Sequence, residues 1–369
     1  MNLLSKARER LNAKNLLDGA FSDERIKASD KRIINGTSDV NQLIPFKYDW
    51  AWQKYLDGSM NHWMPQEISM QKDIAMWKSE SELTADERHI IYAALGFFST
   101  ADTMVANNLV LSIYDRITSA EHRQYLLIQA KEEAVHTHAY QYCVESLGMD
   151  QESIFNQYRE VPEMAAKMAW AGKHTQALSN PNATDQEFLE NLIVFYVVFE
   201  GIFFYCGFPS VLSLGRRNKM NGVAEQFQYI LRDESMHLNF GIDTINQIII
   251  ENPHLWTVDF QNKVIDLILE GLALEIDFTH YVLPNDILGM NQRTAEDYLK
   301  YIVNRRFVQI GLPEIQEWTH IKNPLQWMSE MMDLRKEKNF FETRVTDYQV
   351  GGALDFDDEK DSGAILGWD

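Results

Sequence analysis

Three polar residues share one face of a predicted helix in the segment KEEAVHTHAY, residues 131–140. Each helical residue advances by about 100°, so Glu133, His136 and Tyr140, at positions i, i+3 and i+7, fall nearly on one line. At the i, i+3 spacing, the carboxylate oxygen of Glu133 and the imidazole nitrogen of His136 can bind one metal ion. A single Glu-x-x-His pair is weak evidence for a metal site, because such pairs also occur on the solvated faces of acidic helices.

A second pair with the same spacing, Glu234 and His237, follows in the segment ILRDESMHLNFG. An isolated acid in an apolar helix precedes each pair. Asp102 lies 31 residues before Glu133, and Glu200 lies 34 residues before Glu234. A buried carboxylate without a partner is costly to the folded state. Metal cations would supply the missing partners.

Four predicted helices would therefore contribute one acid, an acid with a histidine, one acid, and an acid with a histidine. That combination is the ligand set of the dinuclear carboxylate site in ferritin-like bundles. Oxygen-rich ligation with one imidazole for each ion suits iron or manganese better than zinc or copper. The expected ligands are Asp102, Glu133, His136, Glu200, Glu234 and His237.

Tyr140 has two interpretations. One turn beyond His136, its ring would lie beside the metal ions, where one-electron oxidation would convert it to a tyrosyl radical. A helix tyrosine is more often a core residue with a hydrogen-bonded hydroxyl. Phe204, Phe208 and Ile230 would form a dry shell for a radical, although aromatic residues at helical spacing also describe an ordinary core.

Long helical patterns run through most of the chain. One begins with a cap at Thr84, and the next begins at Ser119 and ends at Gly148. Clusters of alternating β-branched residues, which would indicate a sheet, are not apparent. The sequence predicts an all-α, ferritin-like helical bundle, with helices at 81–117, 119–148, 184–214, 217–250, 256–282, 293–309 and 324–333.

Composition divides the chain into three parts. Residues 1–40 are polar and mixed in charge, which predicts a partly ordered extension, and residues 41–340 hold the helical domain. Residues 341–369 contain paired glycines, an acidic cluster and an apolar end. This last composition predicts a flexible tail with an adhesive tip.

Charge and apolar content exclude several classes of function. The chain has 34 Lys and Arg against 54 Asp and Glu, for a net charge of −20, which argues against nucleic acid or anionic lipid as a partner. Cys143 and Cys206 lie in apolar helical segments and predict buried, reduced thiols in a cytoplasmic protein. No signal peptide is apparent. The apolar run at 191–214 has the length of a membrane helix, but Glu200 in its middle favours a buried core helix.

The sequence resembles the small, radical-generating subunit of class I ribonucleotide reductase from about Asn41 to Tyr348. The blocks that carry the resemblance are FFSTAD, EEAVHTHAY, FEGIFFY, ILRDESMHLNFGID and NFFETRVTDYQ. The resemblance implies that Tyr140 is the radical tyrosine. It also divides the metal ligands into Asp102, Glu133 and His136 for one ion, and Glu200, Glu234 and His237 for the other.

The same resemblance implies a route for the electron. Trp63 matches the family's tryptophan near the metals, and Asp233 matches the acid that links it to His136. Tyr348 matches the tyrosine that relays oxidation across the subunit interface. The tail tip, GAILGWD, would dock on the large catalytic subunit through its apolar side chains.

The amino-acid sequences of these blocks resemble most those of the chlamydial-type subgroup. That subgroup typically has phenylalanine at the radical position, glutamate as its first metal ligand and a manganese–iron pair. This chain has Tyr140 and Asp102 instead, as tyrosyl-radical enzymes do. We therefore expect a diiron centre with a tyrosyl radical, and manganese–iron or dimanganese centres are the alternatives.

The resemblance implies a homodimer that reacts its reduced metals with oxygen, oxidises Tyr140 and delivers the oxidising equivalent to the large subunit. That subunit would reduce ribonucleotides to deoxyribonucleotides. No glycine-rich phosphate loop is apparent, so the chain itself is not expected to bind the nucleotide. One alternative is a stand-alone dimetal oxidase or oxygenase, which needs an apolar channel to the metals. Another is a metal-storage bundle, which needs neither Tyr140 nor Trp63.

Overall fold

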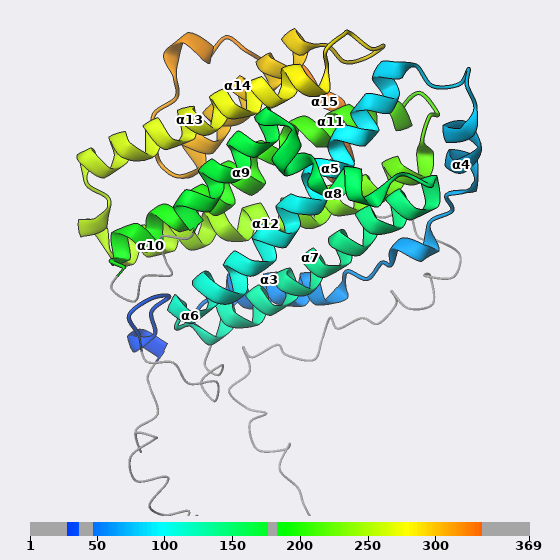
Figure 1. Cartoon of the computed structure of the whole chain (residues 1–369). Helices are drawn as coiled ribbons and strands as arrows, with labels where there is room; N and C mark the ends of the chain where they lie inside the picture. The colour runs from blue at the N-terminus through cyan, green and yellow to red at the C-terminus, as the bar shows by residue number, and fades with distance from the viewer. Residues whose placement is uncertain (1–27, 37–46, 176–182, 334–369) are drawn as a thin grey trace, which may run out of the picture.

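The computed structural model describes residues 28–36, 47–175 and 183–333, which form helices and loops without a β-strand (Figure 1). The predicted all-α class is confirmed. The larger helices are α3 (Asp49–Met60), α4 (Gln71–Lys78), α5 (Ala85–Asn108), α7 (Ala120–Leu147), α8 (Gln151–Glu160), α9 (Pro162–Thr175), α10 (Asp185–Leu192), α11 (Phe204–Gly215), α12 (Asn221–Glu251), α13 (Val258–Val282), α14 (Gln292–Gln309) and α15 (Gln326–Asp333).

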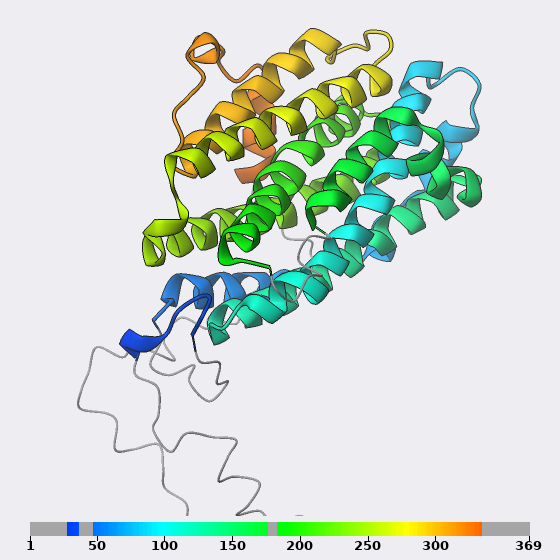
Figure 2. The same ribbon diagram turned by 60° about the vertical axis from the view of Figure 1, so that its left-hand side comes forward.

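The long helices pack side by side as a bundle. Helix α3 lies along α7 at one edge, and α13 and α14 lie at the opposite edge, in both views of the molecule (Figures 1 and 2). Between these edges α5 contacts α7, and α12 contacts α11. The helices expected to carry the metal ligands therefore face a common interior.

Local sequence signals start and end the helices as predicted. The hydroxyl of Thr84 accepts a hydrogen bond from the Glu87 amide at 3.1 Å, and the Glu87 carboxylate accepts one from the Thr84 amide at 2.9 Å. Such a reciprocal pair satisfies two amides that a helix start leaves free. Ser119 caps α7, and Gly148 ends it with φ at +67°, a conformation that favours glycine.

Two of the predicted helices contain wider π-helical turns. The helix expected at 81–117 continues beyond α5 as the π-helix η4 (Leu109–Ile113) and then the short α6 (Tyr114–Arg116). The helix expected at 184–214 is interrupted by the π-helix η6 (Ile193–Phe203), which contains Glu200. Together, α10, η6 and α11 form one continuous helical rod, Asp185–Gly215, which is apolar enough to cross a membrane. Its most apolar stretch is nevertheless wholly buried inside the protein. The expectation of a core helix is confirmed.

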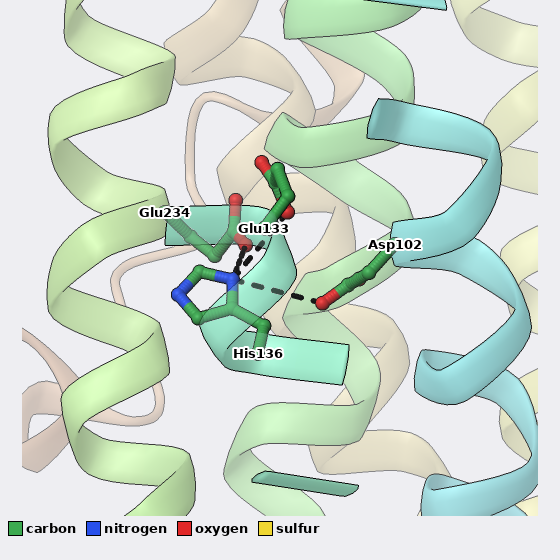
Figure 3. Close-up of side chains that lie close together, drawn as sticks. All are labelled: Asp102, Glu133, His136 and Glu234. Carbon is green, nitrogen blue, oxygen red and sulfur yellow. Dashed lines mark ion pairs between the residues drawn. The ribbon is translucent and has the colours of Figure 1, made fainter. Parts of the chain in front are cut away.

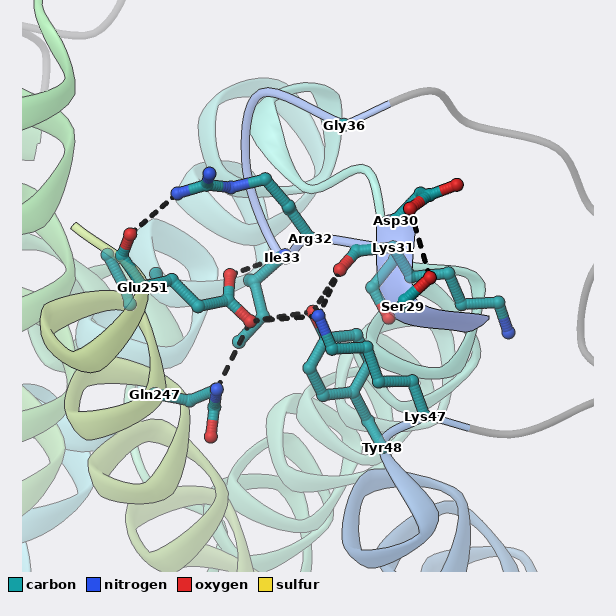
Figure 4. Close-up of polar contacts among 12 residues, drawn as sticks. Ser29, Asp30, Lys31, Arg32, Ile33, Gly36, Lys47, Tyr48, Gln247 and Glu251 are labelled. Atoms are coloured by element: carbon teal, nitrogen blue, oxygen red, sulfur yellow. Dashed lines mark hydrogen bonds and ion pairs between the residues drawn. The ribbon is translucent and has the colours of Figure 1, made fainter. Parts of the chain in front are cut away.

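The N-terminal segment 28–36 lies against the C-terminal end of α12 (Figure 4). Arg32 donates a hydrogen bond to the Glu251 carbonyl at 2.6 Å, and the Ile33 amide donates to the Glu251 carboxylate at 3.2 Å. The hydroxyl of Tyr48, just before α3, donates to the same carboxylate at 2.8 Å. Glu251 thus joins three segments of the chain. The rest of the predicted extension and the predicted tail lie outside the described residues.

Candidate metal centre

The six expected ligands converge on the interior of the bundle. Each has no solvent-exposed side-chain surface. Asp102 comes from α5, and the first Glu-x-x-His pair comes from α7. Glu200 comes from η6, and the second pair comes from α12.

One group of four residues surrounds the imidazole of His136 (Figure 3). Its Nδ1 atom lies 3.1 Å from a Glu234 oxygen, 3.4 Å from a Glu133 oxygen and 3.6 Å from an Asp102 oxygen. These residues come from three different helices. Their side chains point toward one another, so one small cation could contact all four.

A second group of four residues lies beside the first and consists of Glu133, Glu200, Glu234 and His237. The Nδ1 atom of His237 lies 3.2 Å from a Glu133 oxygen and 3.3 Å from a Glu234 oxygen. Glu133 and Glu234 belong to both groups, and each offers a different oxygen to each histidine. Glu133 and Glu234 would therefore be the carboxylates shared by two ions, if both groups hold one.

The polar atoms of the two groups suit metal ions. Both oxygens of Asp102, both oxygens of Glu133 and the Nδ1 atom of His136 are buried without a hydrogen-bond partner among the described residues. Burial, followed by the charges of Glu133 and Glu234, raises the pKa of Asp102 well above its usual value. A divalent cation between these carboxylates would favour their ionised forms. Carboxylate oxygens with one imidazole per position fit iron or manganese.

An acid lies behind each of the two histidines, on the side away from the grouped carboxylates. The Nε2 atom of His136 lies 2.9 Å from an Asp233 oxygen, and the Nε2 atom of His237 lies 2.8 Å from a Glu132 oxygen. An acid at this place fixes the ring and makes the opposite nitrogen a better metal ligand. The pairing is crossed, because the acid on α12 holds the histidine on α7, and the acid on α7 holds the histidine on α12.

Trp63 lies beside His136 and contacts the same acid, Asp233. Its indole Nε1 donates a hydrogen bond to an Asp233 oxygen at 2.9 Å, and its ring centroid lies 6.2 Å from that of His136. Asn61 donates to the other Asp233 oxygen. On its other side, Trp63 stacks on Tyr229 at 5.4 Å. The structure brings together Trp63, Asp233 and His136 in an unbroken series of contacts.

Tyr140 is fully buried beside the first group. The rings of Phe98 and Phe227 lie with their centroids 5.7 Å from that of Tyr140. Its hydroxyl has no hydrogen-bond partner among the described residues. Burial, followed by the negative charges of Asp102 and Glu234, raises the pKa of Tyr140 well above its usual value.

The shell expected around Tyr140 stays a prediction, because the ring contacts that the structure gives for Tyr140 are with Phe98 and Phe227. Phe204 and Phe208 are buried, but they pack on Phe98, with ring centroids 5.2 and 4.9 Å away, and Phe98 packs on Tyr140. Ile230 is also fully buried. Tyr348 lies outside the described residues.

Two polar residues that touch the expected ligands, Glu132 and Gln129, were not predicted from the sequence. Glu132 contacts His237, and the Gln129 amide donates a hydrogen bond to Glu200 at 2.8 Å. A signal for Glu132 is present in the sequence, since an acid directly precedes each ligand glutamate, Glu132 before Glu133 and Asp233 before Glu234. No comparable spacing points to Gln129.

Comparison with known proteins agrees with this geometry. Residues 40–324 match the family described as "Ribonucleotide reductase, small chain". The ribonucleoside-diphosphate reductase subunit beta of Chlamydia pneumoniae is 49% identical over 92% of this chain and 98% of its own length. The corresponding subunit of Treponema pallidum is 30% identical over 89% of this chain and 93% of its own length.

A solved structure has the same fold. The ribonucleotide reductase R2 subunit from Clostridium botulinum superimposes with a TM-score of 0.78 at 29% identity and covers 85% of this chain and 98% of its own. The predicted ferritin-like architecture is thereby confirmed. The chain belongs to the ribonucleotide reductase small chain family.

Proposed function

We propose that this protein is the small subunit of a class I ribonucleotide reductase and supplies the oxidising equivalent for the reduction of ribonucleoside diphosphates. One observation carries the proposal: the series of contacts from Trp63 through Asp233 to His136 ends at two overlapping groups of buried ligands. A metal-storage bundle has no need of an indole hydrogen-bonded to the acid behind a ligand.

The six ligands would hold two iron or manganese ions, which would activate oxygen and supply a strong one-electron oxidant. The protein positions the ligands and excludes water from them. Asp233 and Glu132 orient the two imidazoles. Glu133 and Glu234 present one oxygen to each histidine, which keeps the two positions close together.

Tyr140 is the proposed site of the stored oxidising equivalent. Its burial and its two phenylalanine neighbours keep water and reductants from the ring. After burial, the negative charge of Asp102 contributes most to the raised pKa of the Tyr140 hydroxyl. The choice of tyrosine and aspartate at these positions supports a diiron centre with a tyrosyl radical, and manganese–iron or dimanganese centres remain the alternatives.

The proposed complete enzyme contains a second copy of this chain and a large catalytic subunit. Tyr348 and the tail at 341–369 would connect the two kinds of subunit in the cytoplasm. The oxidising equivalent would leave the metal centre through His136, Asp233 and Trp63, in that order.

The alternative of a stand-alone oxidase needs an apolar path from solvent to the ligands. A cavity of about 1180 Å³ lies between α5, α7, α8 and α9. Its apolar wall includes Phe155, Tyr158 and Met168, but none of the six ligands lines it. This arrangement favours the reductase subunit over an oxidase of bulky apolar substrates.

Reconstitution with a matching large subunit tests the proposal. The metal-loaded protein should convert a ribonucleoside diphosphate to its deoxy form only when both subunits are present. Neither subunit alone should form product. Absence of product from the combined, metal-loaded subunits would refute the proposed function.

A further inference from the structure

The segment that carries Glu200 is an irregular part of the bundle. All eleven residues of η6 are buried, and Glu200 is its only charged residue. In a π-helix each hydrogen bond spans five residues instead of four, which widens the turn and is unfavourable over a long stretch. Such turns persist where surrounding contacts hold them. Glu200 therefore depends on contacts outside its own helix.

Arg306, on α14, makes one of these contacts. Its Nε atom donates a hydrogen bond at 3.1 Å to the carbonyl oxygen of Gly201, the residue after Glu200. Arg306 is only 3% exposed. A buried guanidinium thus binds the backbone directly beside a proposed metal ligand.

The absence of a side chain at Gly201 lets the Arg306 guanidinium come close to the backbone. A Cβ atom at this position would lie 3.0 Å from the Arg306 Nε atom, 3.0 Å from the Tyr196 carbonyl and 3.1 Å from a Leu238 methyl group. All three distances are tighter than ordinary side-chain contacts. A glycine here lets the guanidinium reach the backbone, so the residue type and the hydrogen bond support each other.

Among the described residues, the groups to which Arg306 donates hydrogen bonds and the ring on which it lies are neutral. Besides the Gly201 carbonyl, it donates to the Gln309 side chain at 2.8 Å and lies with its guanidinium carbon 5.2 Å from the centre of the Tyr205 ring. Tyr205 lies on the same rod as Glu200, just beyond η6. Burying a cation is costly unless its donors are satisfied. Two of the three contacts belong to the helix that carries Glu200.

We propose that Arg306 is a positioning residue for the metal ion on the Glu200 and His237 side. Because Arg306 holds the Gly201 carbonyl, it fixes the position of the backbone from which the Glu200 side chain extends. Gln129 holds one carboxylate oxygen of Glu200 at 2.8 Å, and the other oxygen has no hydrogen-bond partner among the described residues. That free oxygen is left for the ion. The inference rests on the proposed function only in that it requires two metal ions.

Arg306→Met tests the role, because it removes the donor while keeping an unbranched apolar stem. We expect the affinity for the second Mn(II) ion to fall about tenfold or more, as for other lost supports of a metal ligand, with the first ion little changed. Anaerobic Mn(II) titration followed by electron paramagnetic resonance separates the two, since a coupled pair and a lone ion give different spectra. Arg306→Lys keeps a cationic donor and should recover part of the affinity.

Leu299→Ala is the matched control, because Leu299 is a fully buried residue of the same helix. It should lower the melting temperature without a selective effect on the second ion. If Leu299→Ala lost as much affinity for the second Mn(II) ion as Arg306→Met does, the loss would reflect lower stability of the fold in general. That result would overturn the proposal. Unchanged binding of both ions by folded Arg306→Met would also overturn it. If that variant does not fold, Arg306→Gln takes its place under the same criteria.

Hydrogen exchange on the metal-free proteins separates this inference from the proposed function. Arg306→Met should accelerate exchange of the backbone amides in η6 and the first turn of α11, whereas Leu299→Ala should not do so selectively. Equal exchange in η6 for wild type and Arg306→Met would contradict the positioning role. If wild type bound fewer than two Mn(II) ions, the two-metal site would fail and the metal-positioning proposal would fall with it, even if exchange showed the local contact.

Discussion

Asp233 lies behind His136, with a carboxylate oxygen 2.9 Å from the imidazole Nε2 atom. The same oxygen accepts a hydrogen bond from the Trp63 indole at 2.9 Å. Because a single oxygen contacts both rings, a change at Asp233 affects the orientation of the histidine and the position of the tryptophan together. Trp63 can be changed separately.

Trp63→Phe should separate electron transfer from metal binding. Phenylalanine keeps an apolar ring but removes the indole donor and is much harder to oxidise. Nucleotide reduction with the large subunit should fall by roughly 100-fold or more, as expected when a reacting group is lost or displaced. Metal content, measured after reconstitution, should stay at the wild-type value.

Trp170→Phe is the control for that variant. Trp170 also donates a hydrogen bond to a carboxylate, that of Glu270, at 2.9 Å, but it lies on α9, which carries none of the six expected ligands. Its replacement should leave nucleotide reduction near the wild-type rate. Similar activity losses in both variants would argue against a specific route through Trp63.

Glu132→Ala should weaken metal binding. The variant removes the acid 2.8 Å from His237 Nε2, so the imidazole loses its orientation. We expect the metal affinity to fall by about 10–100-fold, as for other acids behind metal-bound histidines. Isothermal titration with Mn(II) under anaerobic conditions measures the change. Glu145→Ala, an exposed position on the same helix, should bind as wild type does, and an unaltered affinity in Glu132→Ala would contradict the assigned role.

His122 should make the folded protein sensitive to acid. Burial lowers the pKa of His122 from its ordinary value of 6.5 to about 3. Its Nδ1 lies 2.9 Å from the Ser119 hydroxyl, and the nearby carboxylate of Glu121 is paired with Lys31 at 2.9 Å. Between these two pKa values the unfolded chain binds a proton that the folded protein does not. The free energy of unfolding therefore falls as the pH falls, by up to about 1.4 kcal/mol per pH unit from this group.

His122→Phe should remove that part of the pH dependence. Phenylalanine keeps a flat ring against Trp50 and Phe240, and the Ser119 hydroxyl retains its hydrogen bond to Glu121 at 2.9 Å. Denaturant unfolding of the metal-free protein at pH 7.5 and 5.5 measures the effect. The variant should lose less stability between these pH values than wild type does. An identical loss in both proteins would contradict the buried neutral state of His122.

Deletion of residues 349–369 tests the proposed docking tail. The truncated protein should load metal as wild type does, because no ligand lies in the deleted segment. Nucleotide reduction with the large subunit should disappear, since the apolar tip is the proposed anchor. Retention of activity after the deletion would rule out docking through this tail.

Spacing was sufficient to predict which residues meet at the centre. The repeated Glu-x-x-His pair, with one acid before each, identified all six side chains that the structure brings together. Spacing did not predict that Glu133 and Glu234 face both histidines, because this depends on how α7 and α12 pack. The contact of Glu132 with His237 was missed for the same reason.

The π-helix around Glu200 could not be predicted from periodicity. Residues 193–203 are apolar at every position except Glu200, so no polar face distinguishes a normal turn from a wider one. The ring contacts of Tyr140 with Phe98 and Phe227 were also not predicted. Phe98 and Phe227 touch it because of the way α5 and α12 approach α7, which the sequence of one helix does not contain.

The most direct test of the account is electron paramagnetic resonance after aerobic reconstitution with iron, manganese or both, on wild type and Tyr140→Phe. Tyr140 is fully buried beside the expected ligands, so we predict a tyrosyl doublet in iron-loaded wild type. The doublet should vanish in Tyr140→Phe while metal content is unchanged. A coupled manganese–iron signal that the substitution leaves unaltered, without any tyrosyl doublet in wild type, would contradict the assignment of Tyr140 as the radical residue.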